Sequence, residues 1–403
     1  MERHQKAFAA TIVFILMCAL VKGFRALLAL DSLALNNDAS EYNSVAYMMT
    51  HLFDTSTWEP VWIWYVKLTQ IFIGEGPHAS RLSGIILFML NSTLMATLAT
   101  LWTKKWQLGL LAGLAYIYRP SNSYFAVEFM RDNLALSFSL LFMILICTKA
   151  KTEVTKNWVI AILTLAYAGM VGTRITTAAP FLLLVAWVIW QHRIKLWKAA
   201  IPIGTAGLIM AGNMSHGYQK YDDPMIAANW RLKSTAMAEG HGGCEVCTVV
   251  QVPIEELTSR EWLFGQRSFG KLVEGVSLGY WMIYTNIPWS NPYYQAVFLF
   301  GFAMMLLLGY WQVFIISGIM LNLLPLVLNF ATSHRVVIQQ EAVYAMSIAF
   351  AFVPFLWLAS FLSKAKPRNP YSQAILAKLH RTTTATLPRT TVPWLRFLNL
   401  EKN

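Results

Sequence analysis

The sequence predicts an all-α membrane protein with about ten transmembrane helices, and composition, apolar runs and charge placement support this. The chain has 403 residues, of which 56% are hydrophobic and only 13% charged, and its mean hydropathy is +0.47. Soluble domains carry about 25% charged residues. Apolar runs that approach the length needed to cross a bilayer, about 20 residues, recur along the whole chain.

The spans are assigned in order from the apolar runs. The first covers residues 7–30, and because the run lacks a small-residue cleavage site we expect an uncleaved span and not a signal peptide. After a polar loop, the aromatic segment 61–68 is expected to be an interfacial or half-inserted helix, since Trp and Tyr favour the headgroup level. The other spans are expected at residues 82–102, 107–118, 133–147, 158–172, 178–190, 199–210, 294–308, 313–330 and 342–362.

Charge placement predicts the orientation of these spans. With the N-terminus in the cytoplasm, every dense Lys/Arg cluster falls on the cytoplasmic side, as the positive-inside rule expects. These clusters are Lys104/Lys105, Lys149/Lys151, Arg193/Lys195/Lys198 and the basic tail. The net charge of +12 is therefore explained without a nucleic-acid partner.

The predicted organisation is one polytopic domain over residues 1–362 and a basic cytoplasmic tail over residues 363–403. The domain has two large outer loops, residues 31–58 and 212–292. We expect the tail to lie on anionic membrane lipids. The chain is assigned to the plasma membrane, as in the bacterial inner membrane, with both termini cytoplasmic and the active site extracytoplasmic.

Most polar residues of interest lie on the predicted outer side, at the ends of spans. A channel or a proton-coupled carrier would place ionisable groups inside the spans instead. The pattern favours an enzyme that works at the outer membrane surface on a lipid-borne substrate. These residues are Asp38, Glu41, Glu59, Arg81, Glu128, Arg131, Asp132, Arg174, His334, Arg335 and Glu341.

Asp38 and Glu41 in the first outer loop are candidate general bases. They are three residues apart and would share one face of a helix. An alternative is that Asp38 is a helix N-cap and Glu41 completes a capping box. Tyr42 and Ala46 follow at one-turn spacing, which is typical of a packed helix face.

Arg174 and Arg335 are the candidates for binding a lipid phosphate. A guanidinium can hold a phosphate with two parallel hydrogen bonds. Arg174 lies in a Gly-Thr-Arg turn between two apolar runs, and Arg335 follows His334 just before the last span. His334 is included with the two arginines in the predicted phosphate site. The alternative is that both arginines only snorkel at span ends.

Glu128, Arg131 and Asp132 form a charged group at the start of the predicted span 133–147. One interpretation is local: Arg131 pairs with Asp132 or Glu128, and Asp132 caps the helix. The other is that Glu128 or Asp132 is a second acidic site residue that positions an acceptor or a metal ion.

Cys244 and Cys247 form a Cys-x-x-Cys in the long outer segment. No second Cys-x-x-Cys completes a zinc site in the sequence, and the predicted location is oxidising. We expect a disulfide and not a metal site.

Several of these segments together resemble the GT-C glycosyltransferases of the mannosyl- and aminoarabinosyl-transferase type. The first-loop motif Asp38-x-x-x-Tyr42-x-x-x-Ala46 is followed by Trp58-Glu59-Pro60-Val61-Trp62. Phe129-Met130-Arg131-Asp132-Asn133 resembles a span entry of that family, Gly172-Thr173-Arg174 its "Thr-Arg" turn, and His334-Arg335 is a looser match. The resemblance covers most of the membrane part through short motifs in a shared order.

The resemblance implies a transferase that uses a polyprenyl-phosphate-linked sugar and a glycan, lipid or protein acceptor. Asp38 would be the base, and Arg174 and Arg335 would stabilise the phosphate. Glu59, Glu128, Arg131 and Asp132 would form the acceptor or second acidic site. No cofactor follows from the motifs, and a divalent metal ion is left open.

The chain departs from the family in having Asn37 before Asp38, so the base is left open between Asp38 and Glu41. It also lacks a separate soluble C-terminal domain, so the acceptor is left open. Two other functions remain alternatives. One is a polysaccharide polymerase of the Wzy/EpsG type, and the other is a flippase or transporter of lipid-linked sugars.

Overall fold

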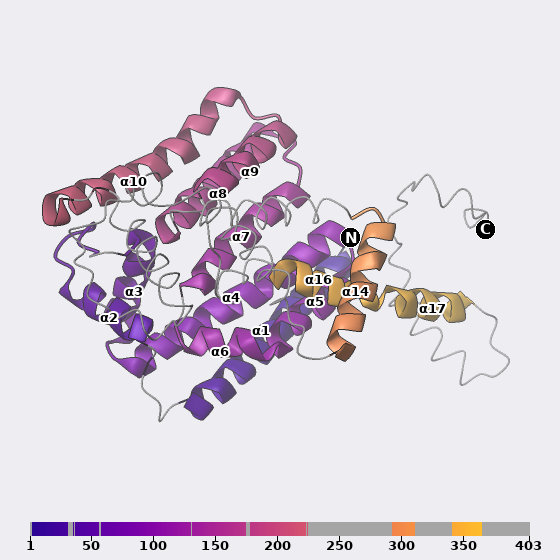
Figure 1. Cartoon of the computed structure of the whole chain (residues 1–403). Helices are drawn as coiled ribbons and strands as arrows, with labels where there is room; N and C mark the ends of the chain where they lie inside the picture. Colours follow the sequence, from indigo (N-terminus) through magenta and orange to yellow (C-terminus); the bar gives the residue numbers. More distant parts are fainter. Residues whose placement is uncertain are drawn as a thin grey trace, which may run out of the picture.

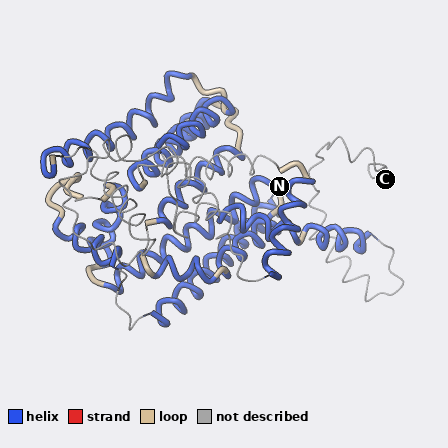
Figure 2. Tube along the Cα trace, in the orientation of Figure 1, coloured by secondary structure: helices blue, strands red, loops and turns tan. Residues whose placement is uncertain are grey.

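The computed structural model describes residues 2–30, 35, 37–55, 58–129, 131–174, 178–222, 224, 292–310 and 341–364, and every regular element among these residues is helical (Figures 1 and 2). The all-α class is therefore confirmed for this part of the chain. The helices are α1 (Glu2–Leu30), α2 (Asn37–Met48), α3 (Pro60–Ile73), α4 (Pro77–Thr103), α5 (Trp106–Tyr118), α6 (Pro120–Val127), α7 (Asp132–Cys147), α8 (Glu153–Thr173), α9 (Ala178–Gln191), the 3₁₀ turn η2 (Leu196–Ala199), α10 (Ala200–Tyr221), α14 (Pro292–Leu307), α16 (Glu341–Ala351) and α17 (Val353–Lys364).

Four helical segments in the described part are long and apolar enough to cross a membrane: Gln5–Leu30, Pro77–Thr103, Glu153–Thr173 and Glu341–Ala359. They support the membrane class. Ten full spans are not seen among the described residues. Helices α5 and α9 have 13 and 14 residues, and at 1.5 Å per residue they reach only about 20 Å of a hydrocarbon core that is about 30 Å thick. The predicted span at 313–330 lies outside the described residues.

Helix α4 occupies the centre of the bundle. It contacts α1, α3, α5, α6 and α7, and its side chains Met95, Ala96, Leu98 and Ala99 are fully buried. Figure 1 shows α2 and α3 gathered at one end of this bundle, α10 along the upper edge, and α14 and α17 at the other end. The first outer loop and the last described helices thus lie at opposite ends of the long axis.

Several helices extend beyond the apolar runs that predicted them. Helix α8 begins at Glu153 and not at residue 158, because Thr152 and Thr155 form a capping box. The Thr152 hydroxyl accepts the backbone N–H of Thr155 at 3.2 Å, and Thr155 Oγ1 accepts that of Thr152 at 3.0 Å. Helix α10 likewise continues to Tyr221, past the predicted end at residue 210.

The chain between α6 and α7 breaks sharply, and the two axes differ by 120°. Phe129 lies in this break with φ of 56°, a left-handed conformation that is unfavourable for a bulky residue. Asn91, near the middle of α4, donates to the backbone carbonyl of Asn133 at 2.8 Å, so the start of α7 lies halfway along α4. Irregular backbone at such a depth is tolerated where protein buries it or where it lines a cavity.

Gly84 allows α4 and α6 to approach closely. A Cβ atom at Gly84 would overlap the backbone carbonyl oxygen of Ala126. We expect Gly84→Ala to lower the free energy of unfolding by about 1–3 kcal/mol, because a backbone group cannot turn away as a side chain can. Gly207 in α10 has no atom within 4 Å of such a Cβ, so Gly207→Ala is the matched control.

The control Gly207→Ala should be neutral or stabilise the protein by about 0.4–1 kcal/mol, because alanine lowers the conformational entropy of the unfolded chain. Unfolding of both variants in one detergent checks this prediction. Equal stability of the two variants would contradict the proposed α4–α6 contact.

Candidate functional site

Helix α2 and the residues just before α3 form the first wall of the candidate site. The predicted outer loop 31–58 contains a helix, α2, whose Ala39, Tyr42 and Ala46 are buried at one-turn spacing. The packed face expected from Tyr42 and Ala46 is therefore confirmed. Helix α2 begins at Asn37, so Asp38 belongs to its first turn and is not the N-cap. The Asp38 side chain lies outside the described part.

Glu41 contacts the indole of Trp58. The Trp58 Nε1–H donates to Glu41 Oε1 at 2.8 Å, across 17 residues of chain. Tyr42 packs edge-on against Trp58 and Trp62, with ring centroids 4.8 and 5.6 Å apart. Trp58 therefore fixes the position of α2 relative to α3, and Glu41 is oriented by this contact and not by a capping box.

Arg131 reaches the same place from the break between α6 and α7. Its Nη1 donates to Glu59 Oε2 at 2.9 Å, and its guanidinium lies over the Trp58 ring, 5.2 Å from the centroid. The local pairing of Arg131 with Asp132 or Glu128 is therefore wrong. The partner is a carboxylate 72 residues earlier in the chain, and Glu59 is only 2% exposed.

Asp132 pairs with Arg174 at the C-terminal end of α8. Both residues are buried, with 2% and 5% of their surfaces exposed. The interpretation of Arg174 as a snorkelling residue is therefore wrong, because snorkelling places the charged head in water. Asp132 is the first residue of α7, within its first turn, so the assignment of Asp132 as the N-cap is also wrong.

We call the group formed by Glu41, Trp58, Glu59, Arg131, Asp132 and Arg174 the polar cluster. Its members come from four segments that the sequence places on one side of the membrane. Glu128, 5% exposed, lies in the same α6–α7 break as Arg131. Four of the predicted second-site and phosphate residues are thus brought together: Glu59, Arg131, Asp132 and Arg174.

The polar cluster combines carboxylates and guanidinium groups; Glu59, Asp132 and Arg174 are buried, Arg131 is partly buried and Glu41 is exposed. A carboxylate can accept a proton from a hydroxyl, and a guanidinium can stabilise a phosphate that gains charge. Within the described residues, no three His, Cys, Asp or Glu side chains are placed to hold a metal ion.

The sequence analysis missed a third charge pair, which lies outside the polar cluster. Arg119 pairs with Glu341, and Asn122 Nδ2 donates to the other Glu341 oxygen at 2.9 Å. The Arg119 guanidinium also lies 4.6 Å from the centroid of the Tyr344 ring. This pair connects the α5–α6 junction to α16. Glu341 stood out in the sequence as an isolated acid before an apolar run, but no local signal identified its partner.

A third cluster connects the segment between α2 and α3 to the end of α10. Asp54 accepts hydrogen bonds from Lys220 at 3.1 Å and from Thr50 at 3.0 Å. Partial burial alone would raise the pKa of Asp54, but these hydrogen bonds outweigh it and lower the pKa from 3.8 to about 2. The contact therefore stabilises the fold above pH 3.8 and is lost as the pH falls towards about 2.

Other predicted residues fall outside the described part of the chain. These are His334, Arg335, Cys244, Cys247 and the tail 363–403 apart from its first two residues. Their predicted roles in phosphate binding, in a disulfide and at the membrane surface stay predictions.

Comparisons of the chain with protein-family models, with curated proteins and with solved structures find no match.

Proposed function

We propose that the chain is an integral membrane glycosyltransferase that moves a sugar from a polyprenyl-phosphate donor to a glycan, lipid or protein acceptor on the extracytoplasmic side. The observation that supports this most is the polar cluster, in which Arg131 reaches Glu59 and Trp58, the partner of Glu41 on α2, and the neighbouring Asp132 pairs with Arg174. These are the residue types that a transfer from a lipid phosphate needs, and they come from the segments that resemble the GT-C motifs.

In the proposed reaction, Asp38 or Glu41 takes the proton of an acceptor hydroxyl as its oxygen attacks the anomeric carbon. The bond between that carbon and the phosphate oxygen breaks, and the electron pair leaves with polyprenyl phosphate. Attack from the opposite face inverts the anomeric configuration. The new negative charge on the phosphate is stabilised by arginine.

Two arginines of the polar cluster can serve the phosphate in different ways. The Arg131 side chain is 14% exposed and that of Arg174 only 6%, so Arg131 is the more accessible to a donor phosphate. Arg174 is held by Asp132, and we expect its charge to stabilise the phosphate from this buried position. Arg335, which the sequence also suggested, would add to these two.

A polysaccharide polymerase is the second candidate. The pairing of the Glu59-Pro60 segment with Arg131 favours it as well, because an early Asp/Tyr loop, a Glu-Pro segment and outer arginines also mark the polymerases. A polymerase would consume oligosaccharides linked to polyprenyl diphosphate, whereas the proposed transferase consumes single sugars linked to polyprenyl monophosphate. The donor class therefore separates the two functions.

The test is donor turnover by the purified protein in proteoliposomes. The panel contains polyprenyl-phosphate mannose, glucose and aminoarabinose, and a polyprenyl-diphosphate oligosaccharide, each with envelope glycolipids as acceptors and with or without a chelator. We expect release of polyprenyl phosphate from one monophosphate donor, with an inverted anomeric centre by NMR. Turnover of only the diphosphate oligosaccharide would replace the proposal with the polymerase, and no turnover of any donor would reject both enzymes.

A further inference from the structure

A cavity of about 1370 Å³ opens at the ends of the helices opposite the polar cluster. It is bounded by the α7–α8 turn, by α9 and the turn after it, and by η2 and the start of α10. None of its lining residues belongs to the polar cluster, and charge placement assigns this end to the cytoplasmic leaflet.

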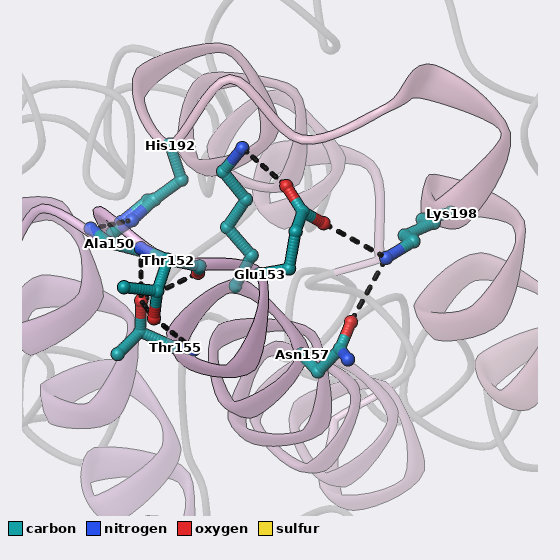
Figure 3. A network of polar contacts seen from close by, with 8 residues as sticks. Ala150, Thr152, Glu153, Thr155, Asn157, His192 and Lys198 are labelled. Carbon is teal, nitrogen blue, oxygen red and sulfur yellow. Dashed lines mark hydrogen bonds and ion pairs between the residues drawn. The ribbon is translucent and has the colours of Figure 1, made fainter.

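The rim of the cavity is built on a fixed polar frame. His192, 2% exposed, accepts the backbone N–H of Ala150 at its Nδ1 (3.0 Å), and its Nε2 contacts the Leu145 carbonyl at 2.8 Å. Gln191 donates to the Thr148 carbonyl at 2.9 Å. The carbonyls at the end of α7 are thereby satisfied, and the α7–α8 turn is held against the end of α9 (Figure 3).

The charge on this rim is strongly positive. Four cationic side chains line the cavity, Lys149, Lys151, Lys156 and Arg193, and no acidic side chain does. The nearby carboxylate of Glu153 accepts a hydrogen bond from Lys156 at 2.8 Å. Its other oxygen lies 3.8 Å from Lys198, and Figure 3 draws the contact between Glu153 and Lys198. Lys198 compensates Glu153 as well, so the cavity keeps a net positive charge.

The wall of the cavity is apolar. Leu182, Val185, Ala186, Trp190 and Ile203 line it. Trp190 is 77% exposed, as suits a side chain at the headgroup level of a bilayer. Basic side chains at a membrane surface next to an apolar wall are complementary to a molecule with an anionic head group and a hydrocarbon tail.

We propose that this cavity binds an anionic phospholipid, with the head-group phosphate at Lys149, Lys151 and Arg193 and an acyl chain along Leu182, Val185 and Ala186. The proposal rests on the membrane-spanning character of the helices and is independent of the proposed glycosyl transfer. Charge complementarity selects an anionic over a zwitterionic lipid, because each basic side chain near an anionic surface contributes a factor of about five in affinity.

The test measures binding of phosphatidylglycerol and phosphatidylcholine to the purified protein by native mass spectrometry. Lys149→Gln with Lys151→Gln should weaken phosphatidylglycerol binding roughly 30-fold, from a factor of about five for each side chain. Lys104→Gln with Lys195→Gln removes the same charge from the same end without touching the cavity and should leave binding within about twofold. Lys149→Arg with Lys151→Arg should keep binding, which separates loss of charge from loss of fold.

A fourth variant tests the apolar wall proposed to hold the acyl chain. Ala186→Trp fills the apolar side of the cavity without changing its charge. It should weaken binding of phosphatidylglycerol but not binding of soluble glycerol phosphate. Equal weakening by the two double Gln variants would show diffuse attraction and overturn the proposal. Binding of phosphatidylcholine as tight as that of phosphatidylglycerol, or full competition by glycerol phosphate, would overturn it too.

Discussion

Replacing Arg174 with glutamine should lower the free energy of unfolding by about 3–5 kcal/mol, because it leaves the buried Asp132 carboxylate without its ionic partner. Donor turnover should fall at least a hundredfold, since removing one group that stabilises transition-state charge typically costs a factor of about 10²–10³. Thermal unfolding in detergent and turnover in proteoliposomes measure the two effects separately.

A paired variant separates stability from catalysis. Arg174→Leu with Asp132→Leu removes both charges, and replacing a buried pair with apolar residues of similar volume is often neutral or stabilising. We expect this double variant to regain most of the lost stability while turnover stays low. A stable double variant with full turnover would show that Arg174 only holds the fold together. Wild-type stability in Arg174→Gln would contradict the buried pair.

Asp38→Asn should reduce turnover by about 10²–10⁴-fold, the usual contribution of a general base, with little change in stability. Glu41→Gln should keep most of the activity, because the glutamine Oε1 can still accept the Trp58 indole N–H. The contrast between the two variants assigns the base, which the sequence left open. Stopped turnover with unchanged thermal unfolding is the expected signature for Asp38→Asn.

Asp54→Asn is the matched control for this pair, since Asp54 lies in the same outer segment but bonds to Thr50 and Lys220. Donor turnover by Asp54→Asn should stay above about half of the wild-type value. If Glu41→Gln is inactive and Asp38→Asn is not, Glu41 is the base. If both variants keep full turnover, α2 only packs against α3 and the proposed mechanism is wrong.

Apolar runs predicted where several helices lie but not how long they are. Helices α7 and α9 start and end within a residue of the predicted limits, because an apolar run covers most of each helix. Helices α8 and α10 begin or end with polar turns that hydropathy does not detect. Helix α2 is hidden in a polar loop because few apolar residues, Ala39, Tyr42, Val45 and Ala46 among them, form its buried face. Ten full spans are not confirmed among the described residues, and α5 illustrates one reason: its short apolar run resembles a span in hydropathy but has only 13 residues.

The residue types of the candidate site were predictable, but their partners were not. Local spacing suggested that Arg131 pairs with its neighbours, whereas its partner Glu59 is 72 residues away. Trp58 carried no signal beyond its place in a motif, although it contacts both Glu41 and Arg131. Pairings between distant segments depend on how helices pack, and a single sequence contains no periodicity that reports this.

The Arg119–Glu341 pair has a consequence for how the protein is made. Its two members are 222 residues apart, so at a synthesis rate of about 5–20 residues per second the ribosome delivers Glu341 roughly 10–45 seconds after Arg119. During that interval, Arg119 and Asn122 at the α5–α6 junction have been synthesised but Glu341, their later partner, has not. Until α16 is synthesised, the Arg119 guanidinium therefore has to remain in contact with water or lipid headgroups. Packing of α16 then brings Glu341 to Arg119.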